Sequence, residues 1–256
     1  MDNGSLVRWK RRHPDGSLSL RLVLACLAVF VIAVPFTALA ALVDTKWGPL
    51  SRLDQSTTRQ ANDWVRHHHG LIDPLRATSY VFHAWVFRVI VVGLAIWLFY
   101  QGARRLAAWA ITTLVAAGVL DALLKVLIDR PRPSLPSAIA HAPGGSFPSG
   151  HALTSVVGTA TIVLILLPLL HGAWRGVAWA IAALISLLSG TCRVLLGVHY
   201  VSDVVAGWIL GAAIVLATTA AFETWRRDEG HRPIDPVVEG TEPEAADEIA
   251  GHPRKT

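Results

Sequence analysis

The chain has 256 residues, of which 53% are hydrophobic and only 16% are charged. This composition excludes an ordinary soluble domain and a disordered chain, and it predicts an all-α integral membrane protein. The formal net charge of +5 does not indicate a nucleic-acid partner, because the basic residues lie at the ends of apolar segments rather than along one face.

Six apolar segments follow one another along the chain, each near the length of about 20 residues that crosses a hydrocarbon core. The first follows a basic stretch, yet it is longer than the apolar region of a secretory signal peptide, so we interpret it as a retained signal anchor. We expect residues 20–222 to form a bundle of six transmembrane helices, with spans at Leu20–Leu42, Ser79–Tyr100, Leu106–Leu127, Ala152–Leu170, Gly176–Gly190 and Val201–Phe222.

Charged residues outside the spans predict the orientation of the protein. Because the number of spans is even, both termini lie on the same side of the membrane. The basic N-terminal segment 1–19, the Arg104–Arg105 loop and Arg226–Arg227 fall on that side, and the positive-inside rule makes it cytoplasmic. We therefore expect a multi-pass protein of the cytoplasmic (plasma) membrane. Cys26 and Cys192 fall in opposite leaflets and are not expected to pair.

Two further segments lie outside the spans. Residues 43–78 are expected to form an extracytoplasmic connection that holds a helix lying in the membrane interface. Its adjacent histidines, 67–69, would point in different directions on a helix, so we interpret them as part of a surface loop rather than as metal ligands. Residues 223–256 are acidic, contain several prolines and have few large apolar side chains, which predicts a disordered cytoplasmic tail.

Charges within the predicted spans require partners, because an unpaired charge in hydrocarbon is costly. Arg88 lies near the middle of the second span and Asp121 in the outer half of the third, so we expect them to pair. Asp121 is also one helical turn before Lys125 and could instead position that lysine. We interpret His83 as a hydrogen-bonded residue between helices.

Three polar clusters adjoin the ends of apolar segments: Lys125 to Pro133 (KVLIDRPRP), Pro148 to His151 (PSGH) and Arg193 to Asp203 (RVLLGVHYVSD). In the predicted topology all three lie on the side away from the cytoplasm. Their chemistry-bearing side chains are three cations, two imidazoles and one carboxylate, from Lys125, Arg132, Arg193, His151, His199 and Asp203. Such a set can hold a phosphoryl group and cleave a phosphate ester without a metal or other cofactor.

The spacing of these residues predicts their roles. His199 and Asp203 are four residues apart at the start of a helix, so the carboxylate can orient the imidazole and leave its second nitrogen free to act as the nucleophile. His151 is placed to protonate the leaving oxygen and then to activate the water that resolves a phosphohistidine. Arg193 supplies one of the cations that neutralise the phosphoryl oxygens.

The remaining cluster residues are expected to bind the phosphate. Ser149 is a natural N-cap and Gly150 permits close approach, so the backbone N–H groups that open the fourth span make an anion site. Arg132 suits bidentate contact with phosphate oxygens, whereas Lys125 is a compact point charge. We expect the nearby Arg130 to be peripheral.

These three clusters resemble the signature of the type 2 phosphatidic acid phosphatase superfamily. That signature is Lys, six residues, Arg-Pro; then Pro-Ser-Gly-His; then Ser-Arg, five residues, His, three residues, Asp. One departure is Cys192, which stands where the family has serine. The resemblance implies a six-helix core, metal-independent hydrolysis and the residue roles given above.

The sequence therefore predicts a membrane phosphatase that acts on a lipid phosphomonoester or diphosphate through a phosphohistidine. The resemblance implies phosphatidic acid, phosphatidylglycerol phosphate or a polyprenyl diphosphate as substrate, with the bilayer as the other partner. Alternatives are a non-hydrolytic binder or transporter of lipid headgroups, a vanadium-dependent haloperoxidase-like enzyme and a phosphotransferase. The residues do not indicate an oligomeric state.

Overall fold

A computed structural model describes residues 33–136 and 139–250, and all regular secondary structure in these residues is helical. This confirms the predicted all-α class. Five helical segments in the described residues are long and apolar enough to cross a membrane: His69–Gln101, Arg104–Ile128, Gly150–Leu169, Ala173–Leu195 and Val201–Asp228. Of the predicted first span, residues 20–32 and Cys26 lie outside the described residues, and a shorter apolar helix covers Ala33–Asp44.

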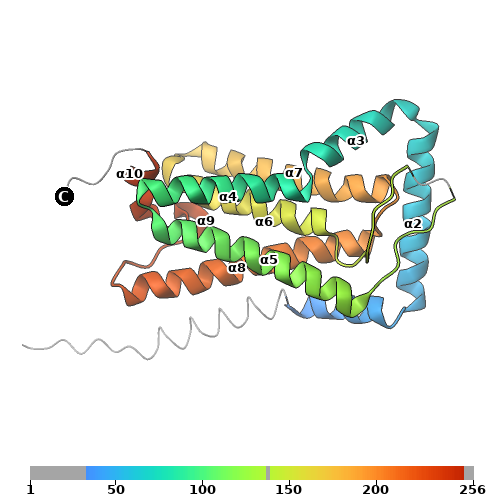
Figure 1. Cartoon of the computed structure of the whole chain (residues 1–256), viewed down its shortest axis with the longest axis horizontal. Coiled ribbons are helices and arrows are strands. Elements are labelled where there is room, and N and C mark those ends of the chain that lie inside the picture. Colours follow the sequence, from blue (N-terminus) through green and yellow to red (C-terminus); the bar gives the residue numbers. More distant parts are fainter. Residues whose placement is uncertain (1–32, 137–138, 251–256) are drawn as a thin grey trace, which may run out of the picture.

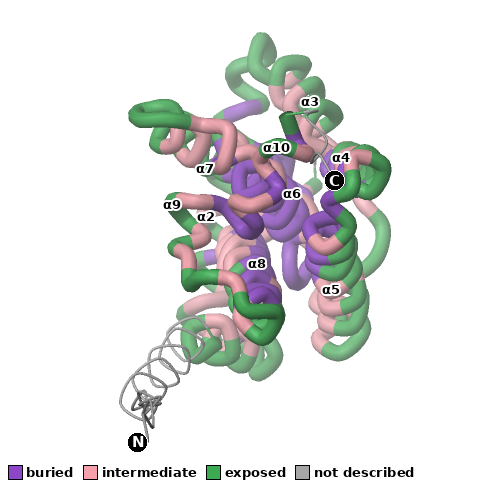
Figure 2. Tube along the Cα trace, turned by 90° about the vertical axis from the view of Figure 1, so that its left-hand side faces the viewer, coloured by how far each residue is buried: buried purple, intermediate pink, exposed green. Residues whose placement is uncertain are grey.

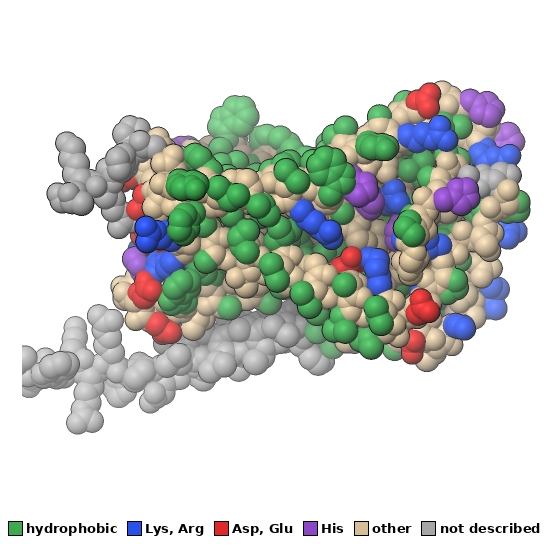
Figure 3. All heavy atoms as spheres, in the orientation of Figure 1, with side chains coloured by type: hydrophobic (Ala, Val, Ile, Leu, Met, Phe, Trp, Pro, Cys, Tyr) green, Lys and Arg blue, Asp and Glu red, His purple; other side chains and the backbone are tan. Residues whose placement is uncertain are grey.

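Helix α6 (Gly150–Leu166) lies at the centre of the bundle. Helices α4 (Ala84–Gln101), α5 (Arg104–Ile128), α7 (Ala173–Leu195) and α8 (Val201–Asp228) surround it, as the end-on view of Figure 2 shows. Most of α6 is buried, whereas α4 and α5 expose many large apolar side chains. Their outer face is predominantly hydrophobic in Figure 3, as expected for helices that contact lipid.

The contact between α6 and α8 is close because α8 presents glycines to it. Gly207 and Gly211 are four residues apart and lie on one face of α8, which is the small-residue spacing that brings membrane helices together. A Cβ atom at Gly207 would lie 2.7 Å from the carbonyl oxygen of Ser149, and one at Gly211 would lie 2.9 Å from that of Leu153. These two glycines therefore set the separation between the starts of α6 and α8.

Helix α2 (Gly48–His67) occupies the connection in which an interfacial helix was predicted, and it lies across one end of the bundle in Figure 1. Its buried residues include Asp54, Thr58 and Asn62, and the Asn62 side-chain amide donates to the carbonyl oxygen of Leu195 over 3.2 Å. Large apolar side chains of α2, among them Trp64, are exposed. This arrangement, with polar residues toward the protein and apolar residues outward, fits a helix that lies between the bundle and lipid headgroups.

The three adjacent histidines are exposed, as expected. They lie at a tight junction between helices rather than in an open loop: His67 ends α2, His68 is its C-cap, and His69 begins the 3₁₀ turn η1 (His69–Leu71). The Nδ1 atoms of His67 and His68 contact backbone carbonyl oxygens one turn earlier, at 2.7 and 2.8 Å.

The predicted second span, Ser79–Tyr100, is not one continuous helix. Helix α3 (Ile72–Val81) ends before Phe82, and α4 starts at Ala84 after the chain changes direction (Figure 1). The break is stabilised by His83, whose imidazole accepts a hydrogen bond from the backbone N–H of Trp85 at 3.3 Å and so caps α4. Arg88 therefore lies about one turn from the start of α4 rather than in the middle of a continuous helix.

The end of the chain also differs from the expectation of a disordered tail. Helix α8 continues to Asp228, and α9 (Pro236–Glu239), η3 (Pro243–Ala245) and α10 (Ala246–Ile249) follow at the end of the bundle opposite α2 (Figure 1). Ala245 and Ile249 are buried in the main hydrophobic core.

The acidic residues of this segment fold back because cations at the end of the bundle neutralise them. Arg226 is fully buried and pairs with Glu223 at 2.6 Å and with Glu244. Arg105 pairs with Glu242 at 3.0 Å and with Glu229. Composition alone suggested a solvated tail because it does not reveal that these carboxylates have basic partners on α5 and α8.

We predict that Gly207→Ala lowers the stability of the protein by about 1–3 kcal/mol, because the added methyl group meets the backbone of α6. The measurement is thermal unfolding in detergent, followed by intrinsic tryptophan fluorescence. Gly118→Ala in α5 is the matched control, since a Cβ atom there meets nothing within 4 Å. Equal unfolding temperatures for the two variants would contradict the assigned packing constraint.

Candidate active site

A polar cavity of about 550 Å³ lies at the end of the bundle near α2 and α3. It is bounded by the start of α4, the last turns of α5 and α7, the start of α6 and the loop between α5 and α6. Its lining residues are Ser79, Tyr80, His83, Ala84, Trp85, Arg88, Asp121, Lys125, Arg132, His141, Ala142, Pro143, Gly150, His151, Arg193 and His199.

His199 is held with one ring nitrogen toward the cavity. Its Nε2 atom lies 3.0 Å from Nη1 of Arg132, and its Nδ1 atom lies 3.4 Å from a carboxylate oxygen of Asp203. Because a guanidinium N–H can only donate, Nε2 is the accepting nitrogen and Nδ1 carries the proton. This tautomer places a lone pair on the cavity side, which a nucleophilic imidazole requires.

Burial favours the neutral form of this imidazole. The His199 side chain is almost completely buried. Burial lowers its pKa, and the charges of Arg132 and Arg193 add to that effect, while Asp203 opposes it. His199 is therefore expected to be neutral near pH 7.

The carboxylate of Asp203 is fixed from behind by residues outside the cavity. Arg130 donates to it at 2.6 Å, and the backbone N–H of Tyr200 donates to its other oxygen at 2.9 Å. Arg130 also donates to Asp54 of α2 at 2.8 Å and lies 4.2 Å from the centre of the Tyr200 ring. Burial disfavours the charge of Arg130, but the two carboxylates outweigh it and raise the pKa of the guanidinium.

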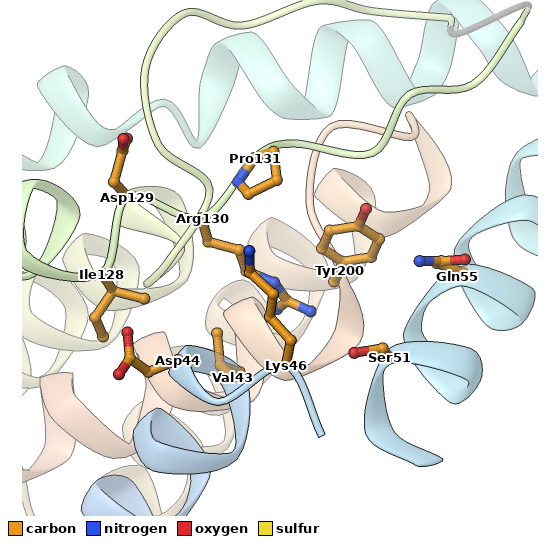
Figure 4. A pocket seen from close by; sticks show the side chains of 10 residues that line it. All are labelled: Val43, Asp44, Lys46, Ser51, Gln55, Ile128, Asp129, Arg130, Pro131 and Tyr200. Carbon is orange, nitrogen blue, oxygen red and sulfur yellow. The ribbon is translucent and has the colours of Figure 1, made fainter. Parts of the chain in front are cut away.

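Figure 4 shows Arg130 among the residues that line a different hollow, where its side chain points toward Tyr200. This second hollow of about 520 Å³ lies between α2, the Ala33–Asp44 helix and the chain after α5. Arg130 is thus peripheral to the catalytic cavity, as expected. It nevertheless contacts the carboxylate that orients His199.

His151 and Arg193 both line the cavity, and each has a side-chain nitrogen without a hydrogen-bond partner among the described residues. Nε2 of His151 and Nε of Arg193 are buried and make no hydrogen bond within the described residues. Nη1 of Arg193 donates to the Ser79 hydroxyl oxygen at 2.7 Å, which fixes the guanidinium. The His151 ring packs edge-on against His83, with ring centroids 4.5 Å apart.

The phosphate-binding residues predicted from the other clusters also lie around the cavity. Lys125 forms an ion pair with Asp121, so the alternative in which Asp121 positions this lysine is the one observed, not an Arg88–Asp121 pair. A Cβ atom at Gly150 would lie 3.1 Å from the Lys125 ammonium nitrogen, so glycine allows the lysine to approach the start of α6.

Two predicted positions are held by the backbone around them. Arg132 donates to three consecutive carbonyl oxygens, those of Pro143, Gly144 and Gly145, at 3.0–3.2 Å. Ser149 is buried, and its backbone N–H donates to the carbonyl oxygen of Asp203 at 2.9 Å, which joins the second and third clusters directly.

Sequence reasoning did not identify the residues that the connection before α4 contributes. Asp54 reaches the site from α2 through Arg130, and Ser79 reaches it from α3 through Arg193. No spacing rule connects these positions to the three clusters. The intramembrane charge of Arg88 was the one available signal, and the structure places it on the cavity wall rather than beside Asp121 as its partner.

Cys192, the residue that departs from the expected serine, is buried beside Arg193. Its thiol donates to the carbonyl oxygen of Leu75 in α3 at 3.0 Å. A hydrogen bond from this position to α3 therefore exists with cysteine, although a thiol is a weaker donor than a hydroxyl.

Comparison with known proteins gives a consistent set of relatives. Residues 106–227 match the sequence profile of the PAP2 superfamily. Phosphatidylglycerophosphatase B of Bacillus subtilis is 34% identical over 112 residues, which are 43% of this chain and 54% of that protein. Lipid A 1-phosphatase of Rhizobium etli is 36% identical over 126 residues, or 46% of this chain and 50% of the relative.

Undecaprenyl-diphosphatase BcrC of Bacillus subtilis is 28% identical over 182 residues, or 68% of this chain and 84% of the relative. The chain thus spans about half the length of the first two relatives and most of the third. The crystal structure of a transmembrane PAP2-type phosphatidylglycerolphosphate phosphatase from Bacillus subtilis has the same fold. Its TM-score is 0.67 at 21% identity, and the match covers 80% of this chain and 98% of that one.

We predict that His199 titrates below its ordinary pKa of about 6.5 and therefore keeps its neutral form as the pH falls below that value. The measurement is the ¹⁵N imidazole shift in histidine-labelled protein, assigned by loss of the signal in His199→Gln. Asp203→Asn should lower the midpoint further, because this carboxylate favours the imidazolium.

Arg130→Gln should move the same midpoint upward, because removal of the cation leaves the Asp203 charge uncompensated. A midpoint at or above 6.5 in the unmodified protein, or shifts of the same sign in the two variants, would contradict the assigned arrangement.

Proposed function

Because residues 106–227 of this chain belong to the PAP2 superfamily, we propose that the protein is an integral membrane enzyme that hydrolyses a lipid phosphomonoester or diphosphate. The observation that carries the proposal is that one cavity is lined by His199, which Asp203 orients, by His151 and by the three predicted cations. The family assignment agrees with the resemblance of the three clusters.

The reaction has two steps in this proposal. Nε2 of His199 attacks phosphorus, a phosphohistidine forms, and the bond from phosphorus to the leaving oxygen breaks while His151 supplies a proton to that oxygen. Water then attacks the phosphohistidine and gives its proton to His151, which releases phosphate and restores both imidazoles. One water is consumed for each phosphate released, and no metal takes part.

The cations around the cavity stabilise the charge of the transferring phosphoryl group. Arg193 offers its free Nε, and Lys125 and Arg132 line the same wall as His199. Together with the backbone N–H group of Gly150, they supply positive charge and donors for the equatorial oxygens. Interactions of this type usually make the largest contribution to catalysis in water-excluded sites.

The position of the cavity supports a lipid substrate that enters from the bilayer. Tyr80 and Trp85 line its mouth and are 77% and 53% exposed, as is usual for aromatic residues at the membrane interface. The neighbouring outer surfaces of α4 and α5 are apolar and can accommodate the lipid tail. The headgroup then enters the polar cavity while the tail stays in the membrane.

The proposed orientation places the cavity outside the cytoplasm, at the plasma membrane. The basic residues Arg104, Arg105, Arg226 and Arg227 lie at the end of the bundle opposite the cavity. By the positive-inside rule that end is cytoplasmic. Lipids of the outer leaflet, such as phosphatidic acid, phosphatidylglycerol phosphate or a polyprenyl diphosphate, would then be the substrates.

We predict that the detergent-purified protein releases phosphate from at least one of these lipids in the presence of EDTA. His199→Ala should lower the rate by at least about 10³-fold, because it removes the nucleophile. His151→Ala should lower it by about 10²–10⁴-fold, the usual contribution of a general acid–base group.

Arg104→Gln is the matched control, since this cation lies at the far end of the bundle and should leave the rate unchanged. Tight headgroup binding without phosphate release in the unmodified protein would favour a non-hydrolytic binder. Oxidation of halide by peroxide after addition of vanadate would favour a haloperoxidase, and transfer of phosphate to a second lipid would indicate a phosphotransferase.

A further inference from the structure

The catalytic cavity contains basic groups beyond those that the proposed reaction uses. Arg88 lies about one turn inside α4, and His83 is the N-cap of that helix. Both residues line the cavity. Neither belongs to the three clusters that predicted the site. The inference drawn from their placement rests on the proposed function and concerns which lipid phosphate is the substrate.

Arg88 has the features of a cation that serves a ligand. Within the part of the chain that the structure describes, its guanidinium makes no hydrogen bond or ion pair, because Asp121 is paired with Lys125 instead. Its Cα atom lies about one turn, or roughly 6 Å, inside the start of α4. A cation at such a depth without a carboxylate partner is costly for structure alone and is a functional-site indicator.

Arg88 and His83 lie on the wall of the cavity toward the bilayer, while His199 and Arg193 lie on its inner wall. Arg88 is exposed at the outer surface of α4, whereas His199 and Arg193 are buried in the bundle. His83 is close enough to both Arg88 and Arg193 to be affected by their charges, so it connects the two walls. A headgroup that reaches His199 from the bilayer therefore passes His83 and Arg88.

The position of His151 identifies which part of the headgroup these residues meet. His151 is proposed to protonate the leaving oxygen, and its ring is packed edge-on against His83 with centroids 4.5 Å apart. The leaving group thus lies on the His83 side of the reacting phosphorus. The leaving group of phosphatidic acid is a neutral alcohol, which has no use for a second cationic wall. The leaving group of phosphatidylglycerol phosphate carries its phosphate a glycerol unit away from the leaving oxygen, whereas that of a diphosphate carries it on the leaving oxygen itself.

We propose that Arg88 and His83 form a subsite for the second phosphate of a lipid diphosphate. The terminal phosphate is transferred to His199, and the phosphate attached to the lipid is held by Arg88 as the leaving group. The Nδ1 atom of His83 accepts the N–H of Trp85, so in the neutral ring its Nε2–H is free to donate to the same phosphate. The products are a lipid monophosphate and inorganic phosphate.

The test uses two substrates with the same tail, farnesyl diphosphate and farnesyl monophosphate. In Arg88→Gln, kcat/KM for the diphosphate should fall by about 10- to 100-fold, the loss expected for one charge-assisted contact, while the value for the monophosphate stays within about twofold. Arg88→Lys should retain part of the selectivity. His83→Asn, which can still cap α4, should lower the diphosphate value selectively.

Equal losses on the two substrates, or no loss on either, would overturn the proposed subsite. Arg104→Gln should change neither value. The subsite is tested independently of hydrolysis by the affinity of the two lipids for the His199→Ala variant, with and without Arg88→Gln. An Arg88-dependent preference for binding the diphosphate, found without phosphate release by the unmodified protein, would support the subsite and contradict the hydrolase.

Discussion

The close contact between α6 and α8 is the constraint on which the rest of the site depends. Gly207 and Gly211 allow the two helices to touch at backbone distance, and the Ser149 N–H donates to the Asp203 carbonyl oxygen at 2.9 Å across that contact. His151 lies two residues after Ser149, and His199 lies four residues before Asp203. Two imidazoles that lie far apart in the sequence are thereby held on one cavity, at the end of helices that stay in the membrane.

A second layer, outside the membrane-spanning helices, holds the same groups in orientation. Asp54 of α2 accepts hydrogen bonds from Arg130 and from the backbone N–H of Ser202, and Arg130 holds the carboxylate that orients His199. Helix α2 is thus part of the site rather than a cover over it. A positioning carboxylate works only if its own lone pairs are constrained, and Asp203 has a donor on each oxygen.

The sequence allowed prediction of the groups whose spacing reflects helix geometry. The apolar lengths identified the spans, and the four-residue interval from His199 to Asp203 indicated a shared face. The break between α3 and α4 was not predictable from hydropathy, because Phe82 and His83 are as compatible with a continuous apolar segment as with a helix junction. Asp54 and the folded acidic segment were missed for a related reason: their partners, Arg130 and Arg226, are distant in sequence, so composition cannot reveal the pairs.

The charges around the cavity differ in how they are compensated, and this difference bears on the ligand. Lys125 is paired with Asp121, and Arg130 with two carboxylates. Among the described residues, Arg88, Arg132 and Arg193 line the cavity with no carboxylate partner, but Arg132 is bonded to backbone carbonyl oxygens that use its N–H groups. At the edge of a low-dielectric bilayer a cation without such compensation is stabilised by water or by an anion that binds there. Arg193 lies on the inner wall and Arg88 on the wall toward the bilayer. The two cations together therefore favour a headgroup that carries negative charge at two depths.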